Sequence, residues 1–225
     1  MTEKQKKEVE IQRSVMSLME QNLTVWQSIP VLKYKYDHFV RNIKKINDHL
    51  EITGTDLAPF REKKLRSMKT LLEQAFPVIS VLGVFGRDTG NTKLNKMVNH
   101  NADELETMNP DALRKYFRRI LRLSRALMEP DQGDGSETPA RKISDYGLTE
   151  KHLVKIETAL NQFISDADTY KEKRKQVKSN KLQLDRRIRD NRILLKTQLS
   201  KLILLFRDSH KDFYREYLSA IGKSS

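Results

Sequence analysis

The 225-residue chain contains no cysteine. This absence excludes disulfides, thiolate zinc sites, iron–sulfur clusters and thiol nucleophiles together, and it fits a reducing compartment. Glycine and proline are also scarce, with 8 and 6 residues respectively. Because tight turns depend mainly on these two residue types, we expect long secondary-structure elements joined by few turns.

Long apolar runs are missing as well. VISVLGVF (78–85) is short, and ILLKTQLSKLILLF (193–206) carries Lys196 and Lys201. Both fall below the roughly 20 apolar residues that a membrane-spanning helix needs. The amino terminus, MTEKQKKEVEIQR, has charge but no apolar segment after it, so no secretory signal is predicted. We therefore expect a cytoplasmic protein without a transmembrane segment.

Positive charge is abundant. Lys and Arg number 43 against 30 Asp and Glu, which leaves a net charge of +13. A 32% share of charged residues beside 37% hydrophobic ones is typical of solvated helices that each carry a single apolar stripe. Such a net charge attracts polyanions without specificity and says nothing about the fold.

Apolar residues recur at helical spacing through most of the chain. The clearest helix runs from Leu32 to Leu50, whose apolar positions are Leu32, Tyr36, Phe39, Ile43, Ile46 and Leu50. Val9–Gln21 forms a second helix, and Ser28–Pro30 interrupts the pattern, so the two form a hairpin. A third helix runs from about Asp56 to Phe85, with Gly54 ending the helix before it.

Capping patterns and apolar stripes predict the remaining helices. Their marks are Asn101–Glu104 as a capping box, Asn109–Pro110 as a helix start, Thr149 as a cap, one stripe from Val177 to Phe206, and Ser209 with Asp212 as caps of a last short helix. Residues 130–147 are predicted to be a flexible loop. We predict an all-α fold: one domain over residues 1–225, an elongated, mainly up-and-down bundle of about six or seven helices.

Three pieces of the chain, SIPVLKYKYDHF, YGLTE and DFYREYLSA, begin at Ser28, Tyr146 and Asp212. Together they resemble a family of uncharacterised bacterial helical proteins, which share a helical hairpin, a Tyr-Gly-Leu-Thr helix start and a carboxy-terminal Asp-Phe-Tyr turn. The resemblance covers most of the chain and implies a helical bundle. It implies no activity and no catalytic residues.

No motif predicts chemistry. GRDTGNTK (86–93) has only three residues between its glycines and lacks the Gly-Lys-Ser/Thr of a phosphate-binding loop, so we predict a helix-to-helix turn. None of the five histidines has Glu three residues before it, which excludes the usual di-iron motif of helical bundles. We predict no catalytic residue, metal or cofactor and expect no enzyme, although motifs cannot reveal a site built from residues distant in sequence.

Two basic stretches are the candidate binding residues. KEKRKQVKSNKLQLDRRIRDNR (171–192) holds ten Lys or Arg and three acids, a net charge of +7. At helical spacing, five of its cations fall within a sector of about 100° beside the apolar stripe: Lys171, Lys175, Lys178, Arg189 and Arg192. The second stretch runs from Arg114 to Arg125 without an acid and contributes Arg114, Arg118, Arg122 and Arg125.

Two interpretations of these stretches remain open. They are either solvated helix faces whose charges pair locally, as in Asp185 with Arg189 or Arg186 with Asp190, or surfaces that contact phosphates. We predict a non-enzymatic helical binding or scaffold module with a protein partner. The alternative is sequence-independent binding of nucleic acid or another polyanion through the basic faces. The oligomeric state cannot be predicted from the sequence.

Overall fold

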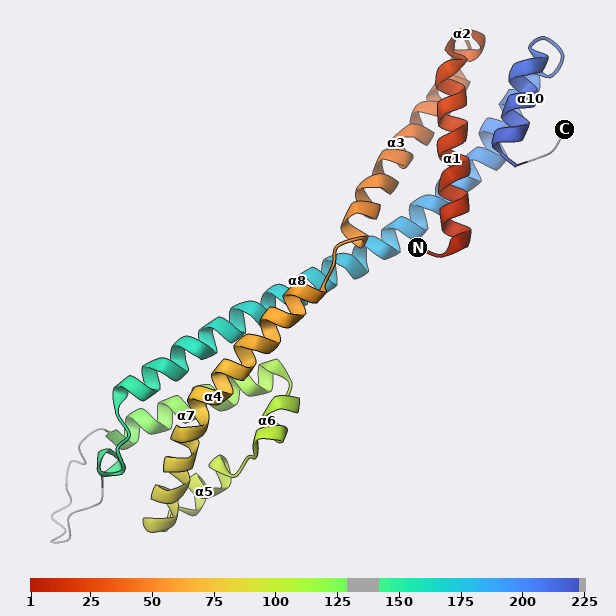
Figure 1. Ribbon diagram of the computed structural model, residues 1–225. Coiled ribbons are helices and arrows are strands. Elements are labelled where there is room, and N and C mark those ends of the chain that lie inside the picture. Colours follow the sequence, from red (N-terminus) through yellow and green to blue (C-terminus); the bar gives the residue numbers. More distant parts are fainter. Residues whose placement is uncertain (129–141, 223–225) are drawn as a thin grey trace. The chain divides into compact units, whose positions relative to one another are not determined.

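The computed structural model describes residues 1–128 and 142–222, and every regular element in these ranges is a helix (Figure 1). The predicted all-α class is therefore confirmed. The predicted helix number and the up-and-down order stay predictions.

Contacts along the backbone divide the chain into two compact units. Unit 1 comprises Met1–Thr55 and Arg174–Ser225, and unit 2 comprises Asp56–Lys173. Each has its own buried apolar cluster. One boundary falls inside the helix α8 (Glu150–Leu194). The assignment of residues 1–225 to a single domain stays a prediction.

Unit 1 is built on three long helical segments: α1 (Glu3–Gln21), α3 (Pro30–Thr53) and the end of α8. The short α2 (Leu23–Trp26) joins α1 to α3, as the predicted hairpin requires (Figure 1). α1 also packs against α10 (Lys211–Ala220). Five of the six apolar positions predicted along α3 are buried, and only Leu50 is partly exposed. The periodicity therefore identified the packed face of this helix correctly.

Unit 2 combines α4 (Ala58–Asp88), α5 (Thr92–Val98), α6 (Ala102–Thr107), α7 (Pro110–Met128), the 3-10 turn η1 (Ile143–Tyr146) and the beginning of α8. Its core is continuous from Leu71 on α4 to Ala167 on α8. Leu113, Phe117 and Ile120, on the inner side of α7, are buried.

The predicted division between a helix after Thr149 and a separate long helix through Val177 is wrong. The two are one 45-residue helix, α8, because no glycine or proline occurs between Glu150 and Leu194. The predicted stripe to Phe206 is also interrupted. A π-helical turn, η2 (Leu195–Leu199), precedes α9 (Ser200–Ile203) and the 3-10 turn η3 (Leu204–Phe206). The wider turn rotates the following residues relative to a regular α-helix, and this rotation places Ile203 among the buried positions.

Two other predicted boundaries need correction. Residues 129–141, which include most of the predicted loop at about 130–147, lie outside the described residues. The rest of the predicted loop contains η1, where Ile143 is buried. Gly54 is the C-cap of α3, as predicted, although its backbone is right-handed rather than left-handed. Ser209 does not cap the last helix, since α10 begins after His210 without a side-chain cap.

The predicted turn at GRDTGNTK (86–93) is confirmed. α4 ends in a Schellman arrangement, in which the amide of Asn91 donates to the Gly86 carbonyl at 2.8 Å and the amide of Gly90 donates to the Arg87 carbonyl at 3.2 Å. Gly90 has a φ of 65°, a left-handed conformation that favours glycine. Asn91 then caps α5 through a 3.0 Å bond from the Leu94 amide to Asn91 Oδ1.

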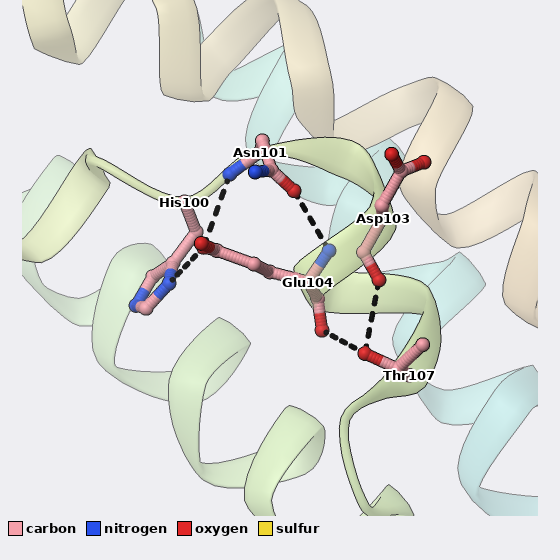
Figure 2. A network of polar contacts seen from close by, with 5 residues as sticks. All are labelled: His100, Asn101, Asp103, Glu104 and Thr107. Atoms are coloured by element: carbon pink, nitrogen blue, oxygen red, sulfur yellow. Dashed lines mark hydrogen bonds and ion pairs between the residues drawn. The ribbon is translucent and has the colours of Figure 1, made fainter.

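The predicted capping box starts α6 (Figure 2). Asn101 Oδ1 accepts from the Glu104 amide at 2.8 Å, and Glu104 Oε2 accepts from the Asn101 amide at 3.3 Å. The same carboxylate oxygen lies 3.1 Å from His100 Nδ1. Figure 2 shows the Glu104 side chain reaching back to His100 and to the backbone of Asn101, so this one side chain fixes both the helix start and the His100 ring.

Candidate functional site

Four predicted polyanion-binding residues lie on the part of α8 that belongs to unit 1. Lys175, Lys178 and Arg189 are exposed, and Arg192 is half-buried. Within the described ranges, none of the four lies within ion-pair distance of a carboxylate. The side chains of Lys175, Lys178 and Arg189 therefore face solvent without a neighbouring carboxylate among the described residues.

The core determines which way these cations face. Leu184, Ile188 and Leu195 are buried against the rest of unit 1. At about 100° per residue, Lys175, Lys178 and Arg189 project roughly 100–160° away from this buried side of α8, toward solvent. The structure thus brings these three predicted residues together on one solvent-facing surface, hereafter the α8 basic face, with Arg192 at its edge.

Only one of the two predicted local ion pairs on this segment forms. Arg186 Nε lies 3.8 Å from Asp190 Oδ2, and both side chains are largely exposed, so the pair contributes about 0–1 kcal/mol. Asp185 instead accepts a hydrogen bond from Gln5 on α1. Among the described residues, local pairing therefore occupies none of the cations of the α8 basic face.

Lys171 does not belong to this group. It lies in unit 2, where its Nζ is 3.9 Å from Asp111 Oδ2 at the start of α7. Sequence periodicity placed it in one sector with the others because periodicity describes a single helix and not its neighbours.

The second predicted cluster, on α7, is divided. Arg114 donates two hydrogen bonds to Asp168, at 2.9 and 3.1 Å. Arg125 pairs with both Glu150 and Glu157, and its hydrogen bond lowers the pKa of the Glu157 carboxyl. Arg118 and Arg122 are exposed and form no ion pair with any described residue. Half of this cluster therefore stabilises unit 2 by joining α7 to α8.

The net charge is unevenly distributed between the two units. Over the bounds of unit 1, the sequence holds 23 Lys and Arg against 12 Asp and Glu, a net charge of +11. Unit 2 holds 20 against 18, a net charge of +2. Nearly all of the excess charge that attracts polyanions is therefore carried by unit 1.

Two groups of residues were missed by the sequence analysis. Gln12, Asn42 and Asn191 form a buried polar layer in unit 1, where each side chain hydrogen-bonds another of the three. In unit 2, Arg87, Lys96 and His100 line an open pocket. The buried polar layer could have been found from the sequence, because its residues interrupt apolar stripes. The pocket residues could not, because they join helices whose contact the sequence does not reveal.

Across residues 1–128 and 142–222, no group of three His, Asp or Glu side chains is placed to hold a metal ion. One stretch, Pro30–Asp88, is long and apolar enough to cross a membrane by length and composition alone. The core helix of a soluble protein meets the same criterion, so the described chain has no clear transmembrane segment.

Comparison with known proteins gives no relative. The chain matches no protein-family model, no curated protein sequence and no solved structure at a significant level. The resemblance to uncharacterised bacterial helical proteins therefore stays a hypothesis.

Proposed function

We propose that this protein is a non-enzymatic, cytoplasmic binding module that holds the phosphate backbone of a nucleic-acid duplex on the α8 basic face, without reading base sequence. The observation that carries the proposal is the set of exposed cations on this face, Lys175, Lys178 and Arg189, which have no ion-pair partner among the described residues.

The charge distribution supports this proposal. A protein that neutralises phosphates releases condensed counterions, and this release drives sequence-independent binding. Cations already paired with carboxylates contribute little, because the acid must first be displaced. The paired Arg114 and Arg125 of unit 2 are poor candidates for this reason, whereas the α8 basic face lies in the unit that carries +11.

The shape of the face favours a duplex over a single strand. From Lys175 to Arg192 a helix rises about 26 Å, roughly three quarters of the 34–36 Å turn of duplex DNA. No aromatic residue occurs in this segment. Single-strand binding uses aromatic side chains on which bases stack, so a straight row of cations suits a phosphate backbone better.

Salt-dependent binding to a random 20-base-pair duplex tests the proposal. The logarithm of the affinity should fall linearly with the logarithm of the salt concentration, with a slope of about −0.9 for each phosphate neutralised. Replacing Lys175, Lys178 and Arg189 together by Glu should make the slope shallower by about 2.7 and weaken binding by about 100-fold or more at low salt. Fluorescence anisotropy should extend to about 100 μM protein, since such affinities are typically 10⁻⁴ to 10⁻⁶ M.

A matched variant on α3 provides the control. Lys33, Arg41 and Lys44 are also exposed in unit 1 and have no ion-pair partner in the described ranges, so their replacement by Glu changes the charge equally. This control should lose far less affinity than the α8 variant. Equal losses would mean that only net charge acts, and an undetectable interaction in 50 mM salt would reject duplex binding altogether.

A second candidate is an acidic protein partner, in keeping with the scaffold role predicted from sequence. Leu182 and Ile193 are 63% and 50% exposed and lie on the same side of α8 as the cations. Protein interfaces typically combine an apolar centre with a polar rim. Replacing both residues by Lys separates the candidates: duplex affinity should stay equal or rise, whereas an interface centred on these apolar side chains would be lost.

A further inference from the structure

Unit 2 contains an open pocket of about 590 Å³ between the second half of α4 and the segment that includes α5. Residues of α4 form one wall, and Asn95, Lys96, Asn99 and His100 form the other. This volume lies within the range of about 300–1,000 Å³ that small-molecule sites occupy. The pocket is therefore large enough for an organic ligand rather than a single ion.

The lining has two chemically different parts. Phe76, Ile79 and Val98 supply apolar surface, while Arg87, Lys96 and His100 supply positive or ionisable nitrogen. Among the described residues, no carboxylate lines the pocket, although Glu104 Oε2 lies 3.1 Å from His100 Nδ1. In the described part of the chain, Arg87 and Lys96 form no ion pair. A ligand carboxylate, sulfonate or phosphate would thus meet cations that no protein acid neutralises.

Neighbouring contacts hold this lining in place. Gly86 lets α4 and α5 approach closely, since a Cβ there would lie only 2.6 Å from Asn95 Oδ1. The Schellman turn and the Asn91 cap set the start of α5. The His100 ring is fixed by Glu104 (Figure 2) and packs edge-on against Tyr116, with ring centroids 5.2 Å apart. Less reorganisation is needed when polar groups are positioned before a ligand arrives.

Gly83, in the pocket lining, is a second observation that supports a ligand site in this pocket. It occupies the interior of α4, where glycine weakens a helix relative to alanine. Its absent side chain leaves the pocket open, because an added Cβ would meet only Val98 Cγ2, at 3.7 Å. The packing around Gly83 therefore does not require glycine. Only an unfilled pocket does, because a larger side chain would occupy it.

We propose that this pocket binds a small organic anion, with the acidic group at Arg87 and Lys96 and an apolar body against Phe76, Ile79 and Val98. The proposal is independent of duplex binding, because it concerns unit 2 and different residues. The chemical class is an aromatic or aliphatic carboxylate, sulfonate or phosphate ester. All ligands of this class carry one negatively charged group joined to one apolar group.

Titration with 8-anilinonaphthalene-1-sulfonate, an aromatic sulfonate whose fluorescence rises in apolar surroundings, tests the pocket in the full chain. One saturable site per chain is expected. Replacing Arg87 and Lys96 together by Gln should weaken binding at least 10-fold. The matched control replaces Arg61 and Lys93 by Gln. Both are exposed in unit 2, lie outside the pocket and have no ion-pair partner in the part of the chain that the structure describes, so affinity should stay within twofold.

Gly83→Leu fills the pocket without touching its cations and replaces a residue that weakens the helix, so the variant should fold, as circular dichroism would confirm. It should also weaken the probe at least 10-fold. Phenylphosphate should displace the probe at lower concentration than inorganic phosphate or benzyl alcohol does, because each of these has only half of the required chemistry. Failure of the probe to bind, or equal affinity in the wild type, the Arg87 and Lys96 double variant and Gly83→Leu, would overturn the proposal.

Discussion

Asn191 on α8 donates a hydrogen bond from Nδ2 to Oε1 of Gln12 on α1, at 3.0 Å, across 179 positions of sequence. Both side chains are fully buried. Asn191 Oδ1 accepts in turn from Asn42 on α3 at 3.2 Å, and Gln12 Nε2 donates to the Ile188 carbonyl at 3.1 Å. A polar layer of this kind fixes the register of three helices, because any sliding leaves buried groups without partners.

Asn191→Leu should destabilise unit 1 by about 2–4 kcal/mol, because Gln12 Oε1 and Asn42 Nδ2 would stay buried without a partner. Urea unfolding measures the loss. Replacing all three polar residues by Leu should recover most of it, since no orphaned polar group then remains. A triple variant that is less stable than Asn191→Leu would contradict this account of the layer.

Gly86→Ala and Gly83→Ala should have opposite effects on stability, although both glycines lie inside α4. At Gly83 the new methyl meets only ordinary contact, so the gain in helix propensity should stabilise the chain by about 0.5–1 kcal/mol. At Gly86 it would lie 2.6 Å from Asn95 Oδ1 and 3.2 Å from Leu94 Cδ2, and overpacking should cost about 1–3 kcal/mol. Thermal melts of the pair check this, and a shared sign would refute the close packing at Gly86.

Asp166 should give unit 2 an acid-sensitive component of stability. Burial alone would raise the pKa of its carboxyl, but hydrogen bonds from Gln162, Lys63 and Ser67, with the charge of Lys63, outweigh burial and lower the pKa. The stabilisation is therefore present above the ordinary value of about 3.9 and is lost as the pH falls through the lower folded pKa.

Urea midpoints measured from pH 6 to pH 2 test this prediction. Asp166→Asn should fall less steeply in acid than the wild type, and Lys63→Met should shift the fall to higher pH. Acid profiles that coincide for all three proteins would show that Asp166 does not couple to folding.

Tyr217 should make unit 1 sensitive to alkali. Burial raises the pKa of its hydroxyl to about 12, although the bond to Ser200 Oγ, at 2.8 Å, acts in the opposite direction. An unfolded tyrosine loses its proton near pH 10, so between about pH 10 and 12 the folded state alone keeps the proton. The unfolding free energy should then fall by up to about 1.4 kcal/mol for each pH unit from this residue.

Tyr217→Phe separates this effect from general alkaline denaturation. At pH 7 it should cost about 1 kcal/mol for the lost hydrogen bond, and near pH 12 it should be the more stable protein. The pH at which the two unfolding free energies cross can be read from urea curves at successive pH values. A difference that stays constant with pH would mean that Tyr217 ionises alike in both states.

Local features were predictable from the sequence. The spacing from Leu32 to Leu50 identified the packed face of α3, and the Asn101–Glu104 box identified the start of α6. Both signals depend on residues within two turns of each other, so they act before any tertiary contact forms. The π-helical turn at Leu195–Leu199 was missed because its backbone departs from the 3.6-residue period on which the prediction relied.

The properties of the candidate site residues were likewise predictable from the sequence only in part. Periodicity correctly placed Lys175, Lys178 and Arg189 on the solvent side of their helix, since a helix face depends only on spacing. It could not show that Arg114 is neutralised by Asp168, 54 positions away.

The amino-acid sequence by itself determined that the chain is helical, where most helices begin, and that a large positive charge faces solvent. Tertiary structure alone decided which cations stay unpaired, which polar residues meet in the buried layer, and that Arg87 and Lys96 border the same pocket as Phe76. The physical reason is the separation along the chain over which each interaction acts. Helix propensity and capping act over a few residues, whereas ion pairs, buried hydrogen bonds and pockets need groups within about 4 Å, whatever their separation along the chain.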